Sequence, residues 1–235
     1  MSPLVVQDFS GWHNGEFEQG RSRVLESGTW KRQRIVMILP AGGSISSKVA
    51  LSLMNLSLPP NNPVMRILAI GMEVGEAYSR AIEGILEEPS LQDWEYVLTV
   101  EHDNLPRPNS LLKLLERMNR HPEIHGLSGL YFQKGEGGWP QIWGDPKDPL
   151  LNFRPQPPVN GEMVECCAIG MGFTLFRLSM FKDARLPRPL FQTKSQPMTS
   201  QDLFFWHHAR EIGYRCAVDC AVKIGHLDPS TGVVW

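Results

Sequence analysis

Three short apolar runs alternate with three amphipathic stretches in the first half of the chain. The runs at residues 35–39, 67–70 and 96–100 are rich in Val, Ile and Leu and contain little polar interruption. Continuous apolar runs of this length are typical of strands buried on both faces of a sheet. After each run, "SISSKVALSLMNL", "EVGEAYSRAIEGILEE" and "PNSLLKLLERMNRH" carry apolar residues at helical spacing. The alternation predicts a parallel sheet with crossover helices.

The second half of the chain has a different pattern. A strand is predicted in "HGLSGLYFQKG", and a long segment rich in Gly, Pro and Trp follows it. A strand-like "MVECCAIGMGFTLFRLSMF", a helix "SQDLFFWHHAREIG" and a final strand "YRCAVDCAVKIGH" complete the pattern. Residues 1–33 are polar and aperiodic, which predicts an irregular N-terminal arm packed through Trp12 and Phe17. We therefore expect a single α/β domain over residues 34–235, with a Rossmann-like, mostly parallel central sheet, flanking helices and a loop-rich second half.

Composition narrows the function classes. With 42% hydrophobic residues in 235, the chain can bury a sizeable core, and its net charge of −2 argues against a general nucleic-acid binder. No apolar run approaches the ~20 residues that cross a bilayer, and the first residues lack the pattern of a secretory signal. These features predict a cytoplasmic protein. Its four cysteines are interpreted as small buried residues rather than as a zinc site: Cys166, Cys167, Cys216 and Cys220.

Polar or flexible residues follow each of the three predicted strands in the first half. Pro40-Ala41-Gly42-Gly43 follows the first strand, Gly71-Met72-Glu73 the second and Glu101-His102-Asp103 the third. In open parallel sheets, ligands bind outside the carboxyl ends of the strands. Three separate strand ends therefore predict one ligand site.

Glu101 and Asp103 have two interpretations. Carboxylates two residues apart on a turn can both reach Mg²⁺ or Mn²⁺, which prefer oxygen ligands. The triplet is equally compatible with an acidic turn in which Asp103 or Asn104 caps the next helix. His226 closes the last predicted strand and supports the metal interpretation only if it meets these carboxylates in space.

Two further segments have a functional and a structural interpretation. Asp202 begins an aromatic helix, either as a helix-start acid behind a Ser200 cap or as a general base. Gly170 and Gly172 suggest close approach of a ligand to the backbone, or simply a tight turn. The two histidines inside the same helix, at 207 and 208, are interpreted as structural.

The order of these parts resembles the GT-A glycosyltransferases, particularly the family 2-like, nucleotide-sugar-dependent kind. "VMILPAGG" looks like the family's first strand and nucleotide loop, and "VLTVEHDNLPRPNSLL" is similar to its D-x-D metal motif. "GMGFTLFRLSMF" resembles its substrate-side glycine segment, "SQDLFFWHHAREIGY" its E-D-x-x-F helix start, and "CAVKIGH" its strand ending in His. The resemblance covers residues 34 to about 228. Three departures are Glu101 for the first Asp of D-x-D, Gln201 for an acid, and Tyr78-Ser79 for an Arg-Asn pair.

The resemblance implies a metal-dependent transfer of a sugar from a UDP- or GDP-sugar donor to a hydroxyl group of a saccharide, protein or other polymer. Asp103 and His226 would hold Mn²⁺ or Mg²⁺ with Glu101, and Asp202 would be the base of an inverting reaction. Residues about 34–125 would bind the nucleotide, and residues about 126–235 would hold the acceptor. The donor site would contain Pro40, Ala41, Gly42, Glu73, Ser79, His102, Gly170, Gly172 and Trp143.

Some alternatives remain open at this point. Trp143, with Trp139, could stack on a sugar or could simply pack beneath the loop. His102 is expected to point away from the ion. A nucleotidyltransferase acting on a sugar phosphate would share the sheet and the metal, although its usual basic residue close after the first strand is absent, Lys48 lying well into the helix. A non-catalytic GT-A binding domain is the other alternative.

Overall fold

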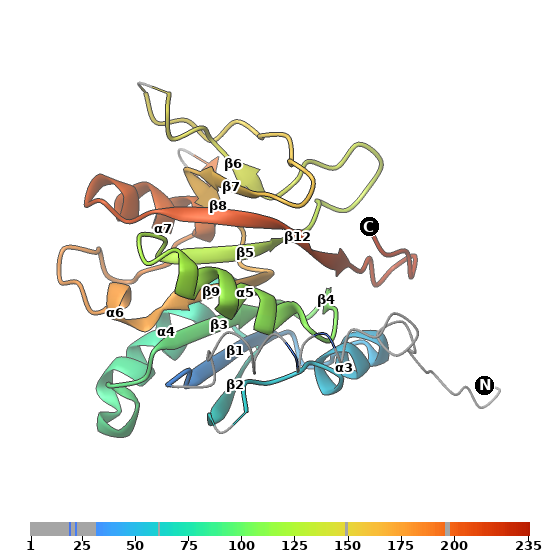
Figure 1. The fold of residues 1–235 in the computed structure, drawn as a ribbon, viewed down its shortest axis with the longest axis horizontal. Coiled ribbons are helices and arrows are strands. Elements are labelled where there is room, and N and C mark those ends of the chain that lie inside the picture. The colour runs from blue at the N-terminus through green and yellow to red at the C-terminus, as the bar shows by residue number, and fades with distance from the viewer. Residues whose placement is uncertain (1–18, 20–21, 23–31, 61, 149, 196–197) are drawn as a thin grey trace.

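The computed structural model describes residues 19, 22, 32–60, 62–148, 150–195 and 198–235. Nearly all of the predicted N-terminal arm over residues 1–33, including Trp12 and Phe17, lies outside the described residues. The rest of the chain forms a mixed α/β architecture around one large sheet (Figure 1).

Among the described residues, eight strands from both halves of the chain form this central sheet. In order across the sheet they are β2 (Val64–Ile70), β1 (Ile35–Ala41), β3 (Tyr96–Val100), β9 (Phe173–Arg177), β5 (Gly126–Leu130), β12 (Cys216–His226) and β4 (Asn104–Pro106), with β7 (Met163–Cys166) also pairing with β12. Because strands of the two predicted halves interleave, the sheet is one structural unit.

The sheet is mostly parallel, as the sequence predicts. Strands β2, β1 and β3 are mutually parallel, and β5 and β12 run in the same direction because β3 and β5 are both antiparallel to β9. The antiparallel β9 in the middle of the sheet was not predicted. A strand buried on both faces reads as an apolar run in either direction, so its hydrophobic pattern does not encode its orientation.

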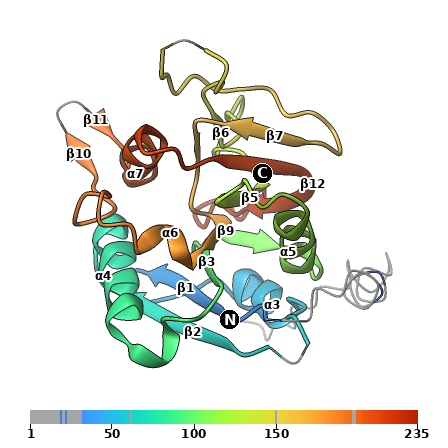
Figure 2. The same cartoon turned by 60° about the vertical axis from the view of Figure 1, so that its left-hand side comes forward.

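Helices cover both faces of the sheet (Figure 2). One face packs against α3 (Ser47–Met54) and α5 (Ser110–Arg120), and the other against α4 (Val74–Glu87), α6 (Leu178–Phe181) and α7 (Gln201–Glu211). A short 3₁₀ turn (Pro89–Leu91) follows α4. None of the helices in the described part of the chain combines the length and apolar character needed to cross a membrane.

Alternating side chains of the strands supply two separate cores. Val36 and Ile38 of β1 point into the core beneath α4, whereas Ile35, Met37 and Leu39 point into the core beneath α5. This is the period-two geometry of a strand covered on both sides. The four cysteines are free and buried, which confirms their interpretation as small core residues.

An aromatic cluster dominates the core on the α7 side. The Phe176 ring of β9 lies 5.3 Å from Phe181 and 5.9 Å from Trp206, measured between ring centroids. The Phe205 ring of α7 stacks on Phe191 at 4.6 Å. Pairs at these separations add to the burial of apolar area, so the cluster fastens α6 and α7 to the sheet.

One expectation about the strands is wrong. The run at residues 67–70 was expected to be buried on both faces, but β2 is the edge strand and Leu68 and Ile70 are each 56% exposed. Strand apolarity alone does not distinguish an edge from an interior position. Short strands also lie in the loop-rich half: β6 (Ile142–Trp143), β8 (Ala168–Ile169), β10 (Lys194–Ser195) and β11 (Met198–Thr199).

Replacing Phe176 tests the aromatic cluster. We expect Phe176→Ala to lower the free energy of unfolding by about 3–5 kcal/mol, because it removes a fully buried ring and leaves a cavity. Leu68→Ala on the exposed edge is the matched control and should cost less than about 1 kcal/mol. Guanidinium unfolding measures both, and equal losses in the two variants would contradict the assignment of the cluster as core.

Candidate functional site

The end of β12 brings His226 to Asp103. Beyond the parallel part of the sheet, β12 pairs antiparallel with β4, and His226 is the register partner of Asn104. The Leu227 amide donates to the Asp103 carbonyl at 2.7 Å, and His226 also exchanges two backbone bonds of 3.0 Å with Trp235. His226 Nε2 consequently lies 3.6 Å from Asp103 Oδ2. His226 was expected to support a metal site only if it met both Glu101 and Asp103. The structure brings it to Asp103, and no ion pair joins it to Glu101 among the described residues.

The ring of His226 is oriented by a second bond. Its Nδ1 lies 2.6 Å from the Phe132 carbonyl oxygen, and since a carbonyl only accepts, Nδ1 is the donor. In the neutral ring Nε2 then carries the lone pair on the side of Asp103. Such a backbone bond is the usual way in which a ligating imidazole is oriented.

The carboxylate of Asp103 is largely buried and only partly satisfied. Its Oδ2 accepts from the Lys134 ammonium and faces His226, while Oδ1 has no hydrogen-bond partner among the described residues. Burial alone would raise the pKa of Asp103, but the neighbouring His226 and the Lys134 ammonium together outweigh it and hold the pKa well below its usual range. Asp103 is therefore an ionised, buried carboxylate with one free oxygen.

Glu101 directly follows β3, is half-buried and behaves differently from Asp103. Its amide donates to the Gly172 carbonyl at 3.0 Å. Burial first, and then the negative charges of Asp103 and Asp202, raise the pKa of Glu101 to about 8, against the opposing charge of Lys134. Glu101 is consequently protonated at neutral pH in this arrangement. The three carboxylates are thus close enough to influence one another, although they come from two distant segments.

Asp202 occupies the first turn of α7 and is 8% exposed. Its Oδ1 accepts from the Ser200 hydroxyl and, at 2.9 Å, from the Leu203 amide. Ser200 stands at the N-cap position of α7 but does not cap a backbone amide of the helix. Its hydroxyl donates to the Asp202 side chain instead. Burial raises the pKa of Asp202, and these hydrogen bonds oppose the rise only in part. We call Glu101, Asp103, Lys134, Asp202 and His226 the edge site.

Gly170 and Gly172 leave room for side chains of the protein. The Gly172 amide donates to the Tyr131 hydroxyl at 2.8 Å, and the Tyr131 ring meets His226 edge-on with centroids 5.6 Å apart. A Cβ at Gly170 would lie 2.1 Å from the Tyr131 hydroxyl, and one at Gly172 would lie 2.6 Å from Asn104 Oδ1. The close approach predicted at these glycines is therefore made by Tyr131 and Asn104.

Other predicted donor-site residues lie at the ends of the strands. Pro40 and Ala41 are buried at the end of β1, and Gly42 follows them in an exposed position. His102, between the two predicted ligands, is also exposed. The structure therefore places these four residues at the predicted edge of the sheet.

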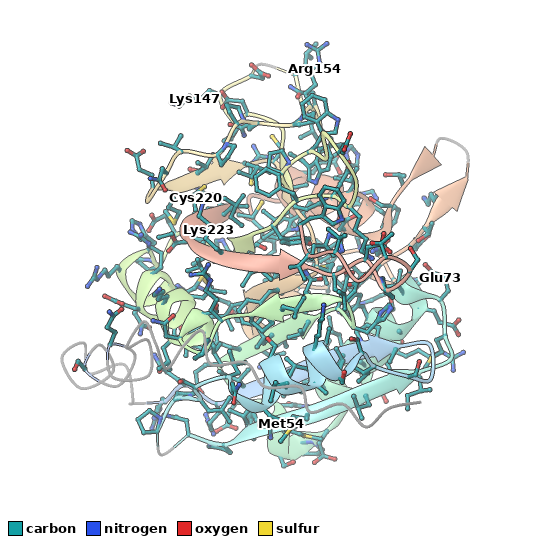
Figure 3. All side chains as sticks on the ribbon, turned by 90° about the vertical axis from the view of Figure 1, so that its right-hand side faces the viewer. Met54, Glu73, Lys147, Arg154, Cys220 and Lys223 are labelled. Carbon is teal, nitrogen blue, oxygen red and sulfur yellow. The ribbon has the colours of Figure 1, made fainter. Side chains whose placement is uncertain are left out.

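Three predicted donor-site side chains already have partners within the protein. Glu73 caps α4 by accepting from the Glu76 amide at 3.1 Å, and it lies at the surface (Figure 3). Ser79 is 2% exposed and exchanges two hydrogen bonds with the backbone of Phe191. Trp143 is half-buried in β6 and donates to Gln141 at 3.1 Å.

Sequence reasoning missed Lys134, Tyr78 and Tyr131. Tyr131 and Lys134 follow the end of β5, so the rule applied to the other strand ends would have included them. Tyr78 is fully buried, and burial followed by the charge of Glu101 raises the pKa of Tyr78 far above normal. Two neutral tyrosines thus surround the carboxylates.

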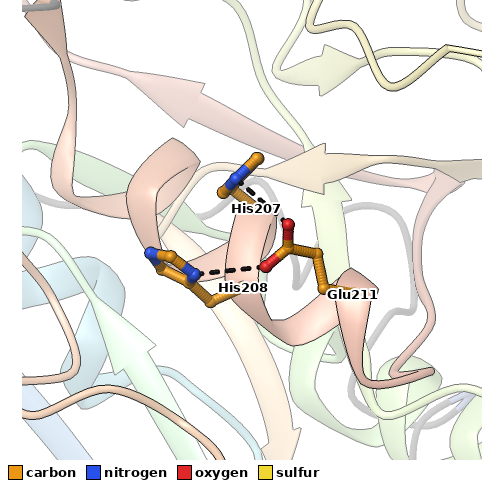
Figure 4. A group of neighbouring side chains, drawn as sticks. All are labelled: His207, His208 and Glu211. Carbon is orange, nitrogen blue, oxygen red and sulfur yellow. Dashed lines mark ion pairs between the residues drawn. The ribbon is translucent and has the colours of Figure 1, made fainter.

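Glu101, Asp103 and His226 do not form a compact set of three ligands. The described part of the chain contains one group of three potential metal ligands that does meet this condition. It consists of His207, His208 and Glu211 on α7, whose ligand atoms lie within 4.8 Å of one another (Figure 4). These side chains stand on the outer face of the helix, away from Asp202. The edge site offers two ligands, Asp103 and His226, with Glu101 nearby.

The buried charge of Asp202 should cost stability. Because the folded state raises the pKa of Asp202, ionisation opposes folding above the usual value of 3.8 and has no effect below it. Asp202→Asn should therefore raise Tm by a few degrees near pH 7, since about 1 kcal/mol corresponds to roughly 2–4 °C in a chain of this size. The gain should shrink as the pH approaches 4. Calorimetry across this range measures it, and a destabilised variant at pH 7 would contradict the prediction.

Comparisons with known proteins support the fold alone. No family model matches the chain, and no curated protein matches its sequence. Among solved structures it is similar to A197 from STIV, with a TM-score of 0.60 and 16% identity over 83% of this chain and 86% of that one. At this identity the likeness establishes a shared architecture and says nothing of a shared reaction.

Proposed function

We propose that this protein is a metal-dependent glycosyltransferase that moves a sugar from a nucleotide-sugar donor to an acceptor hydroxyl. The observation that carries the proposal is the meeting of Asp103 and His226 at the carboxyl edge of the sheet, with Asp202 within electrostatic range. Open α/β sheets bind ligands at this edge. The resemblance of the five motifs to GT-A enzymes supports the same reaction.

The donor atoms of the edge site fit a divalent cation. Asp103 supplies an ionised carboxylate, and His226 presents Nε2 at 3.6 Å from its Oδ2. The second oxygen, Oδ1, is buried without a hydrogen-bond partner among the described residues. Mg²⁺ and Mn²⁺ are commonly held by one or two protein ligands, with water and substrate phosphates completing the shell. A cation held there would supply positive charge to the departing diphosphate.

Asp202 is suited to act as the base. It accepts the proton of the acceptor hydroxyl while the acceptor oxygen bonds to the anomeric carbon and the bond from that carbon to the diphosphate breaks. Burial raises its pKa, which strengthens it as a proton acceptor. Ser200 and the Leu203 amide fix the orientation of its carboxylate from the rigid start of α7.

Glu101 supports the site without holding a charge. In the metal-free protein, burial and the charges of Asp103 and Asp202 raise the pKa of Glu101 to about 8, which favours its neutral form. A neutral carboxyl also has a proton to donate to a substrate oxygen. Glu101, which stands in place of the first Asp of D-x-D, can therefore still form hydrogen bonds when its carboxyl group is neutral.

The test separates donor binding from transfer. Asp103→Ala and His226→Ala should abolish Mn²⁺-dependent binding of UDP- and GDP-sugars in calorimetric titrations, because each removes one of two protein ligands. Asp202→Asn should bind donor as the parent does and lose about 10²–10⁴-fold in the rate of transfer.

His121→Ala is the control, since His121 pairs with Glu123 on the surface and lies outside the edge site. Donor binding by Asp103→Ala and His226→Ala equal to that of the parent would overturn the metal assignment. Full transfer by Asp202→Asn would eliminate Asp202 as the base.

A further inference from the structure

Lys134 occupies the position that the proposed metal requires. Its ammonium contacts Asp103 Oδ2, the oxygen that lies 3.6 Å from His226 Nε2. A divalent cation bound between these two side chains would stand about 2.1 Å from each ligand atom. An ammonium hydrogen-bonded to the same oxygen cannot remain beside that ion, because space and like charge both oppose it.

We propose that the Lys134 ammonium neutralises Asp103 in the metal-free protein and moves to the substrate diphosphate when metal and donor bind. The inference rests on the proposed function and assigns to Lys134 two effects on that site. It weakens the binding of metal alone and strengthens the binding of a nucleoside diphosphate once metal is present.

The segment carrying Lys134 permits this movement. The Lys134 side chain is 32% exposed and lies in the sequence Lys134-Gly135-Glu136-Gly137-Gly138. Gly135 and Gly137 have φ values of 101° and 71°, in the region that favours glycine. Below this tip, the Gln133 amide donates to the Trp139 carbonyl at 2.9 Å and Phe132 pairs with Pro140. The side chain can therefore move while the base of the loop stays fixed.

The base of this loop also holds His226. The Phe132 carbonyl that accepts from His226 Nδ1 lies two residues before Lys134. Movement of the lysine therefore leaves the orientation of the imidazole unchanged. A lysine with only a structural role would compete with the metal for Asp103 but would not strengthen the binding of a nucleoside diphosphate.

Metal titration of the full chain tests the inference. Mn²⁺ binding is measured by calorimetry without donor, in the parent, Lys134→Met, Lys134→Arg and Lys147→Met. Lys147 is an exposed lysine on a different loop (Figure 3) and serves as the matched control. Lys134→Met should bind Mn²⁺ about tenfold more tightly or better, whereas Lys134→Arg and Lys147→Met should behave as the parent does.

A second titration measures the other effect. In saturating Mn²⁺, Lys134→Met should bind UDP about tenfold more weakly than the parent. Unchanged Mn²⁺ affinity in Lys134→Met, with parental binding that depends on Asp103, would overturn the inference and leave the proposed function standing. Absence of Asp103-dependent Mn²⁺ binding in every variant would overturn both.

A different observation, on the outer face of α7, supports a second and independent inference. His207 Nε2 lies 3.5 Å from Glu211 Oε1, and His208 Nδ1 lies 3.4 Å from Glu211 Oε2. The two rings are 5.0 Å apart between centroids, and the three side chains are 46%, 33% and 56% exposed (Figure 4). Two imidazoles and one carboxylate thus converge from one turn of a helix.

We infer that this group binds a borderline transition-metal ion such as Zn²⁺. Ligands about 2.0–2.2 Å from a tetrahedral Zn²⁺ lie roughly 3.3–3.6 Å from one another. Each imidazole nitrogen lies at such a distance from a different oxygen of Glu211, and one ligand atom from each of the three side chains lies within 4.8 Å of the others, so a small adjustment of these exposed side chains would bring them around one ion. Imidazole favours Zn²⁺ over Mg²⁺, so this site and the edge site should select different ions. Exposure of the three side chains gives the ion direct access.

Zinc titration tests this site. The parent should bind one equivalent of Zn²⁺, and His207→Ala with His208→Ala in one chain should weaken that binding at least about tenfold. His121→Ala is the matched control, because His121 lies 3.1 Å from Glu123 but has no second imidazole. Undiminished Zn²⁺ binding in the double variant would overturn the inference. The double variant also provides a background in which Mn²⁺ reports on the edge site alone.

Discussion

The pairing of β12 with β4 is the contact on which the edge site depends. β4 begins directly after the acidic turn that follows β3, and β12 is the last strand of the chain. Their antiparallel register sets His226 opposite Asn104, and the bond from the Leu227 amide to the Asp103 carbonyl fixes the offset. A slip of one residue would turn the His226 ring to the other face of the strand. The chemistry proposed here therefore depends on backbone hydrogen bonds as much as on the side chains themselves.

The same region holds three carboxyl groups whose burial and mutual repulsion are unfavourable. Glu101 and Asp202 are carboxyl groups whose pKa values burial raises, and Asp103 is ionised with one oxygen unpartnered among the described residues. Buried carboxyl groups of this kind oppose folding, and the two large cores on either side of the sheet offset the cost. Lys134 and the protonated state of Glu101 reduce the negative charge that the site must hold before a cation or substrate arrives.

Much of the fold could be predicted from hydrophobic periodicity. The strands at the centre of the sheet and helices α4, α5 and α7 follow the pattern of apolar residues, because each is buried along a regular face. The direction of β9, the exposure of β2 and the short β4 were not predictable in this way. They depend on which strands become neighbours, and that is decided by contacts between residues far apart in the sequence, such as Tyr96 with Arg177 and His226 with Asn104.

Strand ends and one helix start identified most residues of the edge site. Asp103 and His226 were found by the rule that ligands bind beyond the carboxyl ends of strands, and Lys134 satisfies the same rule after β5. Ser79 was assigned to the donor by motif position and Glu73 by its place after a strand, yet their hydrogen bonds with Phe191 and Thr193 tie α4 to the segment between α6 and β10. Local sequence cannot reveal such use, since the partners lie more than 100 residues away.

The two proposed cation sites differ in the burial of their ligands and in the partners that those ligands have before an ion binds. At the edge site, the carboxylate is buried and a lysine already neutralises it, so an incoming ion must displace a charge that the fold provides. On α7, the ligands are exposed, and the contacts with which an ion must compete are those between the two imidazoles and one carboxylate, which water can replace at little cost. Binding at the edge site is therefore expected to be coupled to substrate, because a diphosphate offers the displaced lysine a new anionic partner. Binding on α7 needs no such partner, and the difference follows from burial and charge.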